Sequence, residues 1–310
     1  MAESILISIC IPAYKRTDYL QRLLDSVAAQ TFTDFEVVLS DDSPDDSVRQ
    51  MSTQYQNRFP ISYHRNSTPL GTPENWNQAV RMARGEWIKL MHDDDWFADA
   101  QSLQVFVDLL QAHPGSVFFF SAYANIELAL NRTEKVLASS FRLKKLYQNP
   151  ATLFAKNVIG PPSAVLYKKN NRIEYDNELK WLVDIDFYIR YLSSAKPVYT
   201  SQVLVNIGIS DSQVTKESFR NKNIEIPESL LLLNKLGANS FRNILVFDAM
   251  WRLMRNLGIR DGGEISKSGY SGEIPSQVFA IINFQKKIPQ GFLRNGFGSK
   301  LLMMICYLFA

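Results

Sequence analysis

The sequence predicts an α/β domain built on a mostly parallel, Rossmann-like sheet that is flanked by helices. Short apolar segments of strand type alternate with helical segments through about residue 120, which is the pattern of α/β folds. Polar residues follow three of the strands, at Pro12-Ala13-Tyr14, Asp41-Asp42 and Asp93-Asp94-Asp95. Ligands bind at the carboxyl edge of open α/β sheets, so this recurrence predicts a binding site.

The first strand and helix carry clear signals. Residues 5–11 (ILISICI) form a short apolar, β-branched run that ends at Pro12, as in a strand buried on both faces. Thr17 or Asp18 is suited to cap the helix that follows. The apolar residues of that helix recur at helical spacing. They are Leu20, Leu23, Leu24 and Val27.

The remaining elements are predicted from the same patterns. We expect strands at 35–39, 61–64, 87–91, 118–121 and 164–167. We expect helices at 45–56, from Thr72-Pro73-Glu74 onward, and at 184–192, 228–236 and 240–257. Residues 262–273, which contain several Gly and Ser, are expected to form a loop. The sheet domain should span 1–220, and a helical region at 221–310 should contact an acceptor or a membrane.

Composition excludes several classes of protein. Lys and Arg number 34 against 31 Asp and Glu among 310 residues, so no basic excess points to a nucleic acid. Cys10 and Cys306 both lie in apolar segments, which argues against a disulfide framework and fits a reducing compartment. The N-terminus, with Glu3 and no basic leader, is unlike a signal peptide. We therefore expect a cytoplasmic protein.

The C-terminal residues 301–310 (LLMMICYLFA) are apolar but too few to span a bilayer. Lys286, Lys287, Arg294 and Lys300 precede them. Two interpretations stay open. The segment lies on the cytoplasmic face of the inner membrane as a peripheral anchor, or it packs on the core of the protein itself.

The acidic run His92-Asp93-Asp94-Asp95-Trp96 is the strongest chemical signal. Adjacent carboxylates at the end of a buried strand repel one another unless a cation or hydrogen bonds absorb the charge. Oxygen ligands favour a hard divalent cation, Mg²⁺ or Mn²⁺. The alternative is an acidic turn that caps the next helix. His64, His92 and His113 lack metal-ligand spacing, and His92 is expected only to tune the acidic run.

Other carboxylates also follow predicted strands or begin a helix. Asp42 can accept from a base or a ribose hydroxyl, or can simply cap a helix. Asp184 and Asp186 begin an apolar helix, where one can act as a general base and the other can pair with Arg190. The turn 160–163 (GPPS) shapes a pocket or is only a turn.

Several enzyme classes lack their motifs in this sequence. The loop after the first strand contains PAYKRTDY, with no glycine-rich phosphate loop. The Gly-x-Ser-x-Gly nucleophile turn is also missing. These absences weaken assignment as a dehydrogenase, a kinase or a hydrolase.

Six motifs in order resemble the family 2 glycosyltransferases, which have the GT-A fold. They are SICIPAYKR (8–16), DFEVVLSDDS (34–43), GTPENWNQA (71–79), ARGEWIKLMHDDDW (83–96), GPPSAVLYKK (160–169) and WLVDIDFYIRYL (181–192). The resemblance covers roughly residues 5–215. It is closest to bacterial enzymes that build lipopolysaccharide O-antigen or capsule.

The resemblance implies roles for the matching residues. The nucleotide-sugar would be bound by Pro12, Ala13, Tyr14, Arg16, Asp42, Asn77, Asp93 and Asp94. Asp95 would be the metal ligand, although the three adjacent aspartates leave the register open by one residue. Asp184 would be the catalytic base. The sugar and acceptor pocket would contain Gly160, Pro161, Pro162, Ser163 and Trp181.

One segment departs from the family pattern. Many relatives carry Arg or His before a Thr in the stretch that corresponds to residues 207–215, but this sequence has Gly208, Ser210 and Asp211. A basic contact to the diphosphate would then have to come from elsewhere, such as Lys216 or Arg220.

These observations predict a metal-dependent, inverting glycosyltransferase. A sugar would move from a nucleotide-diphosphate donor to a hydroxyl of a glycan or lipid-linked oligosaccharide acceptor in bacterial surface polysaccharide synthesis. The alternatives are a sugar nucleotidyltransferase, which usually needs a glycine-rich basic loop, and a non-catalytic protein of the same fold that binds glycan or membrane.

Overall fold

The structure is a computed structural model that describes residues 5–209 and 220–309. The chain forms two compact units. The first comprises Met1–Tyr147 and Val158–Asp211, and the second comprises Gln148–Asn157 and Ser212–Ala310. We predicted two domains that were each one continuous stretch of sequence, divided near residue 220. In the structure, the segment Gln148–Asn157 joins the C-terminal unit because Ala151 and Phe154 pack into its apolar core.

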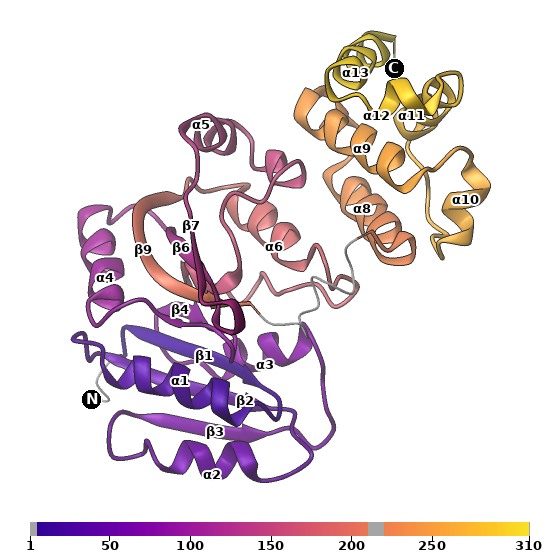
Figure 1. Ribbon diagram of the computed structural model, residues 1–310. Coiled ribbons are helices and arrows are strands. Elements are labelled where there is room, and N and C mark those ends of the chain that lie inside the picture. The colour runs from indigo at the N-terminus through magenta and orange to yellow at the C-terminus, as the bar shows by residue number, and fades with distance from the viewer. Residues whose placement is uncertain (1–4, 210–219, 310) are drawn as a thin grey trace. The chain divides into compact units, whose positions relative to one another are not determined.

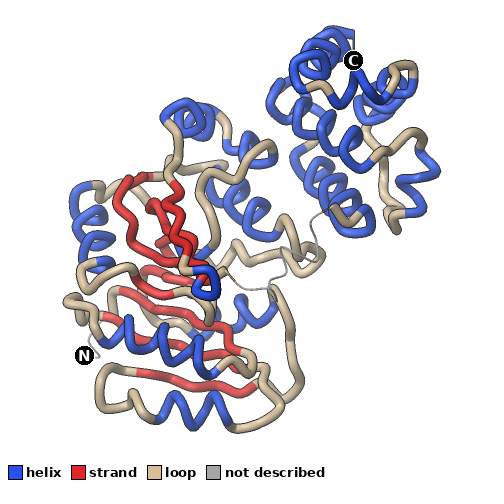
Figure 2. Tube along the Cα trace, in the orientation of Figure 1, coloured by secondary structure: helices blue, strands red, loops and turns tan. Residues whose placement is uncertain are grey.

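In the described residues, the first unit is organised around one sheet of nine strands in the order β3-β2-β1-β4-β8-β6-β9-β5, with β7 beside β6 (Figures 1 and 2). The strands are β1 (Ile7–Ala13), β2 (Phe35–Asp41), β3 (Ile61–Arg65), β4 (Trp87–Leu90), β5 (Trp96–Phe97), β6 (Phe118–Glu127), β7 (Arg132–Val136), β8 (Val165–Lys168) and β9 (Val198–Gly208). The first four strands are mutually parallel, as the alternating pattern predicted.

The other half of the sheet is mixed. Strand β8 is antiparallel to β4 and β6, while β9 is parallel to β6 and antiparallel to β5. This arrangement brings the end of β9 beside the segment that follows β4. The sequence pattern did not indicate β9, because only the second half of this strand is buried.

Helices cover both faces of the sheet. Those of the first unit are α1 (Thr17–Ala28), α2 (Ser47–Thr53), α3 (Glu74–Met82), α4 (Ser102–Ala112), α5 (Ser140–Gln148) and α6 (Val183–Leu192). Short 3₁₀ turns lie at Leu128–Leu130, Pro150–Phe154, Pro162–Ala164 and Ala238–Arg242, of which the first and third belong to this unit.

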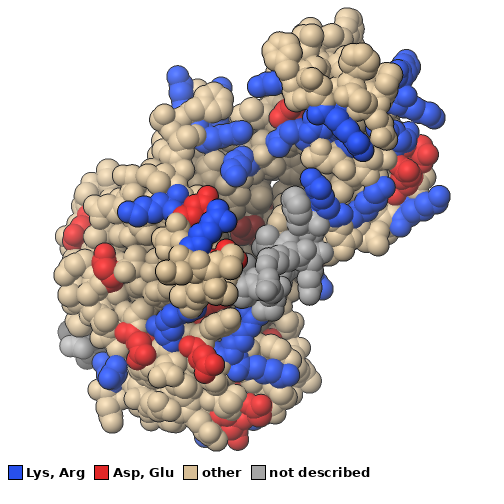
Figure 3. Space-filling view, in the orientation of Figure 1, with Lys and Arg blue, Asp and Glu red and all other residues tan. Residues whose placement is uncertain are grey.

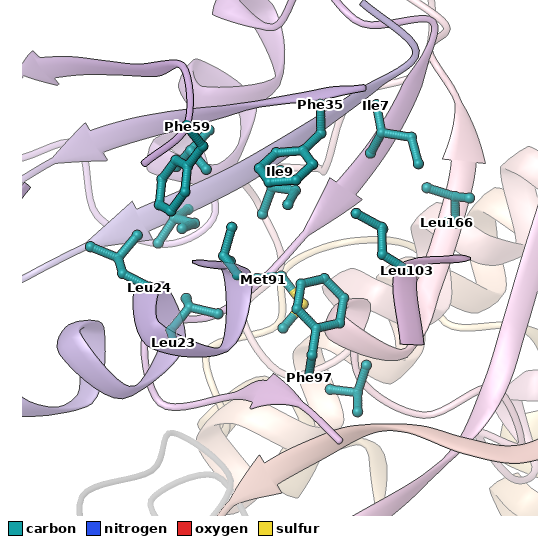
Figure 4. Close-up of a cluster of buried hydrophobic side chains, with 14 of the residues drawn as sticks. Ile7, Ile9, Leu23, Leu24, Phe35, Phe59, Met91, Phe97, Leu103 and Leu166 are labelled. Atoms are coloured by element: carbon teal, nitrogen blue, oxygen red, sulfur yellow. The ribbon is translucent and has the colours of Figure 1, made fainter. Parts of the chain in front are cut away.

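The face under α1 and α4 forms the main core. The four apolar positions predicted for α1 are all buried there, and Figure 4 shows Leu23 and Leu24 packed with Ile9 and Phe35 of the strands. On the opposite face, the Cys10 thiol contacts the Ala79 carbonyl of α3 at 3.6 Å. Successive residues of a strand face opposite sides of the sheet, so β1 is buried on both of its faces.

The second unit is helical. It contains α8 (Lys222–Leu236), α9 (Ile244–Leu257), α10 (Gly262–Lys267), α11 (Ser276–Lys286), α12 (Gln290–Arg294) and α13 (Gly296–Phe309). The prediction of a loop at 262–273 was wrong in its first half. The Asp261 side chain accepts from the Glu264 N–H at 3.0 Å, and this cap stabilises α10 despite its glycines.

The C-terminal helix has two different faces. Ser299, Met303 and Cys306 of α13 are buried within the second unit, so the segment packs on its own core as one of the two interpretations required. On the outer face of α13, Phe297 and Leu308 are 85% and 77% exposed. The buried face and the exposed face of this helix therefore both carry apolar residues. Within residues 5–209 and 220–309, no helix is both long and apolar enough to cross a membrane.

Candidate functional site

The carboxyl ends of β1, β2 and β4 meet at one edge of the sheet. Ala13 lies opposite Asp41 in the β1–β2 ladder, and the Asp42 N–H donates to the Ala13 carbonyl at 3.0 Å. On the other side of β1, the Met91 N–H donates to the Cys10 carbonyl at 2.9 Å. The three polar segments predicted from the sequence are therefore brought together.

The acidic run forms a turn between β4 and β5, in which the Asp95 N–H donates to the His92 carbonyl at 3.1 Å. Its three carboxylates have different surroundings. Burial, and then the Asp94 charge, raise the pKa of Asp93 to about 7. The Asp93 carboxylate also accepts from the backbone N–H of Tyr14. Asp93 thus faces the end of β1.

Asp94 faces a cation from the same end of β1. Its carboxylate lies 3.5 Å from the Arg16 guanidinium, and both side chains are partly exposed. Arg22 of α1 donates to the Asp94 carbonyl at 3.0 Å and lies 3.8 Å from the centre of the Trp96 ring. Arg22 was not predicted as a site residue, although position 22 lies between the apolar positions of its helix.

Asp95 is only 2% exposed. It accepts from the Gly208 N–H at 3.2 Å and from the Ser163 hydroxyl. Burial, followed by the charge of Asp94, raises the pKa of Asp95 well above its usual range. Two neutral donors hold the carboxylate without neutralising it, so the site favours a cation or a proton.

Lys89 lies beneath this carboxylate in the middle of β4, and its side chain is fully buried. Its ammonium donates to the carbonyls of Ser163 and Val165. Burial lowers the pKa of Lys89 to about 7, against the opposing effect of the Asp95 charge. Lys89 was predicted only as one residue of the strand at 87–91, without a role in the site. A lysine inside a strand with four buried residues was the available signal.

His92 belongs to the same cluster. Its Nδ1 lies 3.8 Å from an oxygen of Asp95, and its ring lies 4.7 Å from the ring of Trp76. Its Nε2 is buried, and no hydrogen-bond partner lies within the described chain. Possible ligand atoms of His92, Asp94 and Asp95 all lie within 4.8 Å of one another. The expectation that His92 would only tune the acidic run therefore missed its place among candidate ligands.

The backbone of β9 passes directly over this turn. A Cβ at Gly208 would lie 2.4 Å from the Asp94 carbonyl oxygen, so only glycine fits without displacing the turn. Ser210, Asp211 and Lys216 lie outside the described residues, and Arg220 belongs to the C-terminal unit.

Asp42 organises the loop before α3. It accepts from the N–H groups of Leu70 and Gly71 at 3.0 and 2.8 Å and from the Asn66 amide at 2.8 Å. The neighbouring Asp41 accepts from the Tyr63 hydroxyl at 2.7 Å. Tyr14, by contrast, is 49% exposed at the end of β1.

The amide of Asn77 forms hydrogen bonds with the backbone of Tyr175. It donates to the Tyr175 carbonyl and accepts from the Tyr175 N–H, each at 2.8 Å, and the side chain is 2% exposed. In this structure Asn77 holds the loop before α6, so it is not among the residues that we propose for the nucleotide.

The turn at 160–163 directly precedes β8 in the chain and packs between Tyr123 of β6 and Tyr188 of α6. Gly160 has φ of +95°, and a Cβ there would lie 2.3 Å from the Tyr123 ring. The Tyr188 hydroxyl donates to the Gly160 carbonyl at 3.1 Å. Pro162 and Ser163 form a buried 3₁₀ turn after Pro161. Through Ser163, this turn is joined to both Asp95 and Lys89.

Asp184 lies in the first turn of α6, after the half-buried Trp181. Burial raises the pKa of Tyr123 to about 12, and the Asp184 charge adds to this shift. Asp184 has the same secondary effect on Tyr188. Tyr123 and Tyr188 both lie against Gly160, so the Asp184 charge acts on side chains that surround the turn at 160–163. Asp186 is buried and pairs with Arg190 at 2.6 Å, as the sequence predicted.

Comparison with known proteins gives consistent results. The family model "Glycosyl transferase family 2" matches residues 8–171. Abequosyltransferase RfbV of Salmonella typhimurium is 36% identical over 34% of this chain, and an uncharacterized glycosyltransferase of Rickettsia typhi is 23% identical over 93%. The matched region spans 33% of RfbV and 88% of the Rickettsia protein.

Solved structures agree on the fold. Staphylococcus aureus TarS 1-349 in complex with UDP-GlcNAc has a TM-score of 0.65 and 17% identity, over 97% of this chain and 89% of its own. The mannosyltransferase PcManGT of Pyrobaculum calidifontis, in complex with GDP-Man and Mn²⁺, has a TM-score of 0.56 and 14% identity, over 98% and 84%. The fold predicted from the motifs is confirmed: the chain has the GT-A fold and belongs to glycosyl transferase family 2.

Proposed function

We propose that this glycosyltransferase moves a sugar from a nucleotide-diphosphate donor to a hydroxyl of a glycan acceptor, with inversion, in the synthesis of a bacterial surface polysaccharide. The observation that carries the proposal is the clustering of His92, Asp94 and Asp95 beside the end of β1. The similarity to an abequosyltransferase and to structures that hold UDP-GlcNAc or GDP-Man supports it.

The end of β1 suits the nucleotide. Tyr14 offers an exposed ring for stacking on a base, and Arg16 is a cation that already lies beside Asp94. Pro12 and Ala13 form the strand end under these side chains. Asp42 would act on the nucleotide by shaping the 66–71 loop, because its carboxylate already accepts three hydrogen bonds.

The donor set fits a divalent cation. The buried Nε2 of His92 has no hydrogen-bond partner among the described atoms, and the buried Asp95 accepts from two neutral donors, the Gly208 N–H and the Ser163 hydroxyl. His92, Asp94 and Asp95 would hold Mg²⁺ or Mn²⁺. A bound cation neutralises charge on the diphosphate leaving group. Asp93, which faces Tyr14, is left for the nucleotide-sugar.

Asp184 is proposed as the general base. It would accept the proton of the acceptor hydroxyl while that oxygen bonds to the anomeric carbon and the diphosphate oxygen leaves from the opposite side. The turn at 160–163 and Trp181 would orient the acceptor. Lys89 and Ser163 hold that turn against the acidic run, so donor and acceptor positions would be fixed relative to each other.

Two other functions are less well supported. A sugar nucleotidyltransferase would need phosphate contacts from the loop after β1, but this loop contains no glycine and Lys15 itself adopts a positive φ of 63°. A non-catalytic binder would not need the Asp184 carboxylate. Hydrolysis of a nucleotide-sugar in the absence of acceptor would separate an enzyme from a binder.

Replacing His92 with alanine should weaken Mn²⁺ binding about tenfold or more, because loss of a direct ligand should cost at least as much as loss of an outer-shell partner. Titration of free Mn²⁺ followed by electron paramagnetic resonance measures this. His113→Ala is the matched control, since His113 ends α4 away from the acidic run. Equal Mn²⁺ affinity in wild type and His92→Ala would remove His92 from the ligand set.

Asp93→Asn should change how stability depends on pH. Folded Asp93 holds its proton up to about pH 7, whereas an unfolded aspartate loses it near pH 4. Without metal, the Asp93 contribution to the free energy of unfolding therefore falls as the pH rises from about 4 to 7, by about 1.4 kcal/mol per pKa unit at most. Urea unfolding in EDTA at pH 5 to 8 should show wild type losing more stability than the variant, and parallel curves would contradict the shift.

Asp184→Asn should lower turnover by about 10²- to 10⁴-fold while leaving Mn²⁺ and donor binding intact, because only the proton acceptor is lost. The assay would use the nucleotide-sugar that most raises the Tm in a screen with Mn²⁺. Glu178→Gln removes an exposed carboxylate shortly before α6 and serves as the control. Turnover near that of wild type in Asp184→Asn would require a different base.

We also propose that the acceptor is lipid-linked and that α13 contacts a membrane surface. Its outer face carries Phe297, Leu301 and Leu308, all exposed, and Lys300 and Arg294 lie within or just before the helix. Apolar residues beside basic ones on one short helix are typical of interfacial segments.

The double variant Leu301→Ser/Leu308→Ser should reduce co-sedimentation with phosphatidylglycerol vesicles, because less apolar area can enter the interface. Its thermal stability should be nearly unchanged, since both side chains already face solvent. Leu128→Ser, at a leucine that is 62% exposed in the first unit, is the control. Undiminished vesicle binding by the double variant would refute the membrane contact.

A further inference from the structure

The C-terminal unit contains a cavity of about 420 Å³ that is lined by basic and neutral residues. Four arginines contribute to it, Arg220, Arg255, Arg260 and Arg294, with the polar Asn256 and Gln290 between them. Among the described residues, no carboxylate lines the cavity. Figure 3 shows many Lys and Arg side chains on the visible face of this unit, with few Asp or Glu among them.

Arg255, unlike its neighbour Arg252, has no carboxylate partner among the described residues. Arg252, one helical turn before the cavity, is paired with Asp248 at 3.0 Å. Arg255 instead donates to neutral oxygens, those of Asn256 and Ser299, at 3.0 and 2.8 Å. Its burial, and then the nearby Arg252 charge, lower the pKa of Arg255.

Arg260 and Arg294 add to this excess of charge. Nη1 of Arg260 is buried without a hydrogen-bond partner in the described chain. Within residues 5–209 and 220–309, no carboxylate forms an ion pair with Arg255, Arg260 or Arg294. A buried donor left unsatisfied is costly, so the protein keeps an unfavourable arrangement here.

The helix dipole does not account for the cluster. Arg255 lies in the last turn of α9, where a cation is favourable. Arg260 follows that helix, however, and Arg294 ends α12. Three separate parts of the chain thus each contribute an arginine to the lining of one cavity, which helix stabilisation alone would not require.

We propose that this cavity is an anion site for a phosphate-class ligand, a diphosphate or a phosphodiester. Guanidinium groups match phosphate oxygens through paired N–H donors, and the cavity is of the size that accommodates small ligands. The site lies wholly within the C-terminal unit and uses none of the residues proposed for the donor, the metal or the base. The cavity proposal and the sugar-transfer proposal can therefore fail separately, and Arg294 is the residue that the cavity shares with the proposed membrane contact.

The test is calorimetric titration of the full chain with inorganic pyrophosphate in EDTA, which removes metal-dependent binding at the acidic run. Arg260→Gln/Arg294→Gln should weaken pyrophosphate binding about tenfold or more, because each lost charged hydrogen bond is worth at least that factor. Arg242→Gln, an exposed arginine of the same unit that does not line the cavity, should leave it unchanged.

The single variant Arg294→Gln guards against misfolding, because Arg294 is exposed and its loss should leave the Tm unchanged. It should still weaken pyrophosphate binding measurably. Pyrophosphate affinity equal to that of wild type in both cavity variants would overturn the proposal.

Phosphatidylglycerol vesicles distinguish the source of the phosphate. If Arg260→Gln, which leaves Arg294 and α13 unchanged, loses vesicle binding, the ligand is a phosphate carried on a lipid. If vesicle binding persists while pyrophosphate binding weakens, the ligand is a phosphate free in solution. Absence of both effects would count against an anion site.

Discussion

The rest of this site depends on one constraint, the burial of adjacent negatively charged carboxylates. Asp95 is removed from water directly beside Asp94, and Asp93 is one residue further away. Charges so arranged are tolerated only where donors or cations surround them. The neighbours of the turn follow from this demand: two neutral donors on Asp95, Arg16 beside Asp94, and a backbone N–H on Asp93.

The same demand explains why segments far apart in sequence must converge. Ser163 donates to Asp95 with its hydroxyl and accepts from the buried Lys89 ammonium with its carbonyl. Gly208 reaches Asp95 with its N–H because it has no Cβ. A buried ammonium needs several acceptors, and the carbonyls of Ser163 in the turn and Val165 at the start of β8 supply them. Satisfying Asp95 and Lys89 thus fixes the 160–163 turn and the end of β9 against β4 and the acidic run.

The sequence was sufficient for features set by local pattern. The buried strands β1, β2 and β4, the apolar face of α1 and the Asp186–Arg190 pair all follow from short-range spacing. Features set by tertiary contact could not be predicted. Nothing local distinguishes the Asn77 amide bound to a loop from one bound to a nucleotide, and the place of His92 depends on how the turn closes. In α10, one cap from Asp261 outweighed the glycines.

From the sequence alone, the roles of the three adjacent aspartates could not be assigned to within one residue. In the structure, each of the three has different surroundings. Asp93 accepts from the Tyr14 backbone and so belongs to the side of β1. Asp95 points the other way, toward Ser163 and Gly208, and shares this position with His92. Asp94 stands between them and touches Arg16. A cation held by the last two aspartates would therefore lie between the β1 end and the 160–163 turn. We propose the donor diphosphate at this place, with Asp93 on the side of the nucleotide and Asp95 on the side of the sugar, because Asp93 contacts the end of β1 and Asp95 contacts the 160–163 turn.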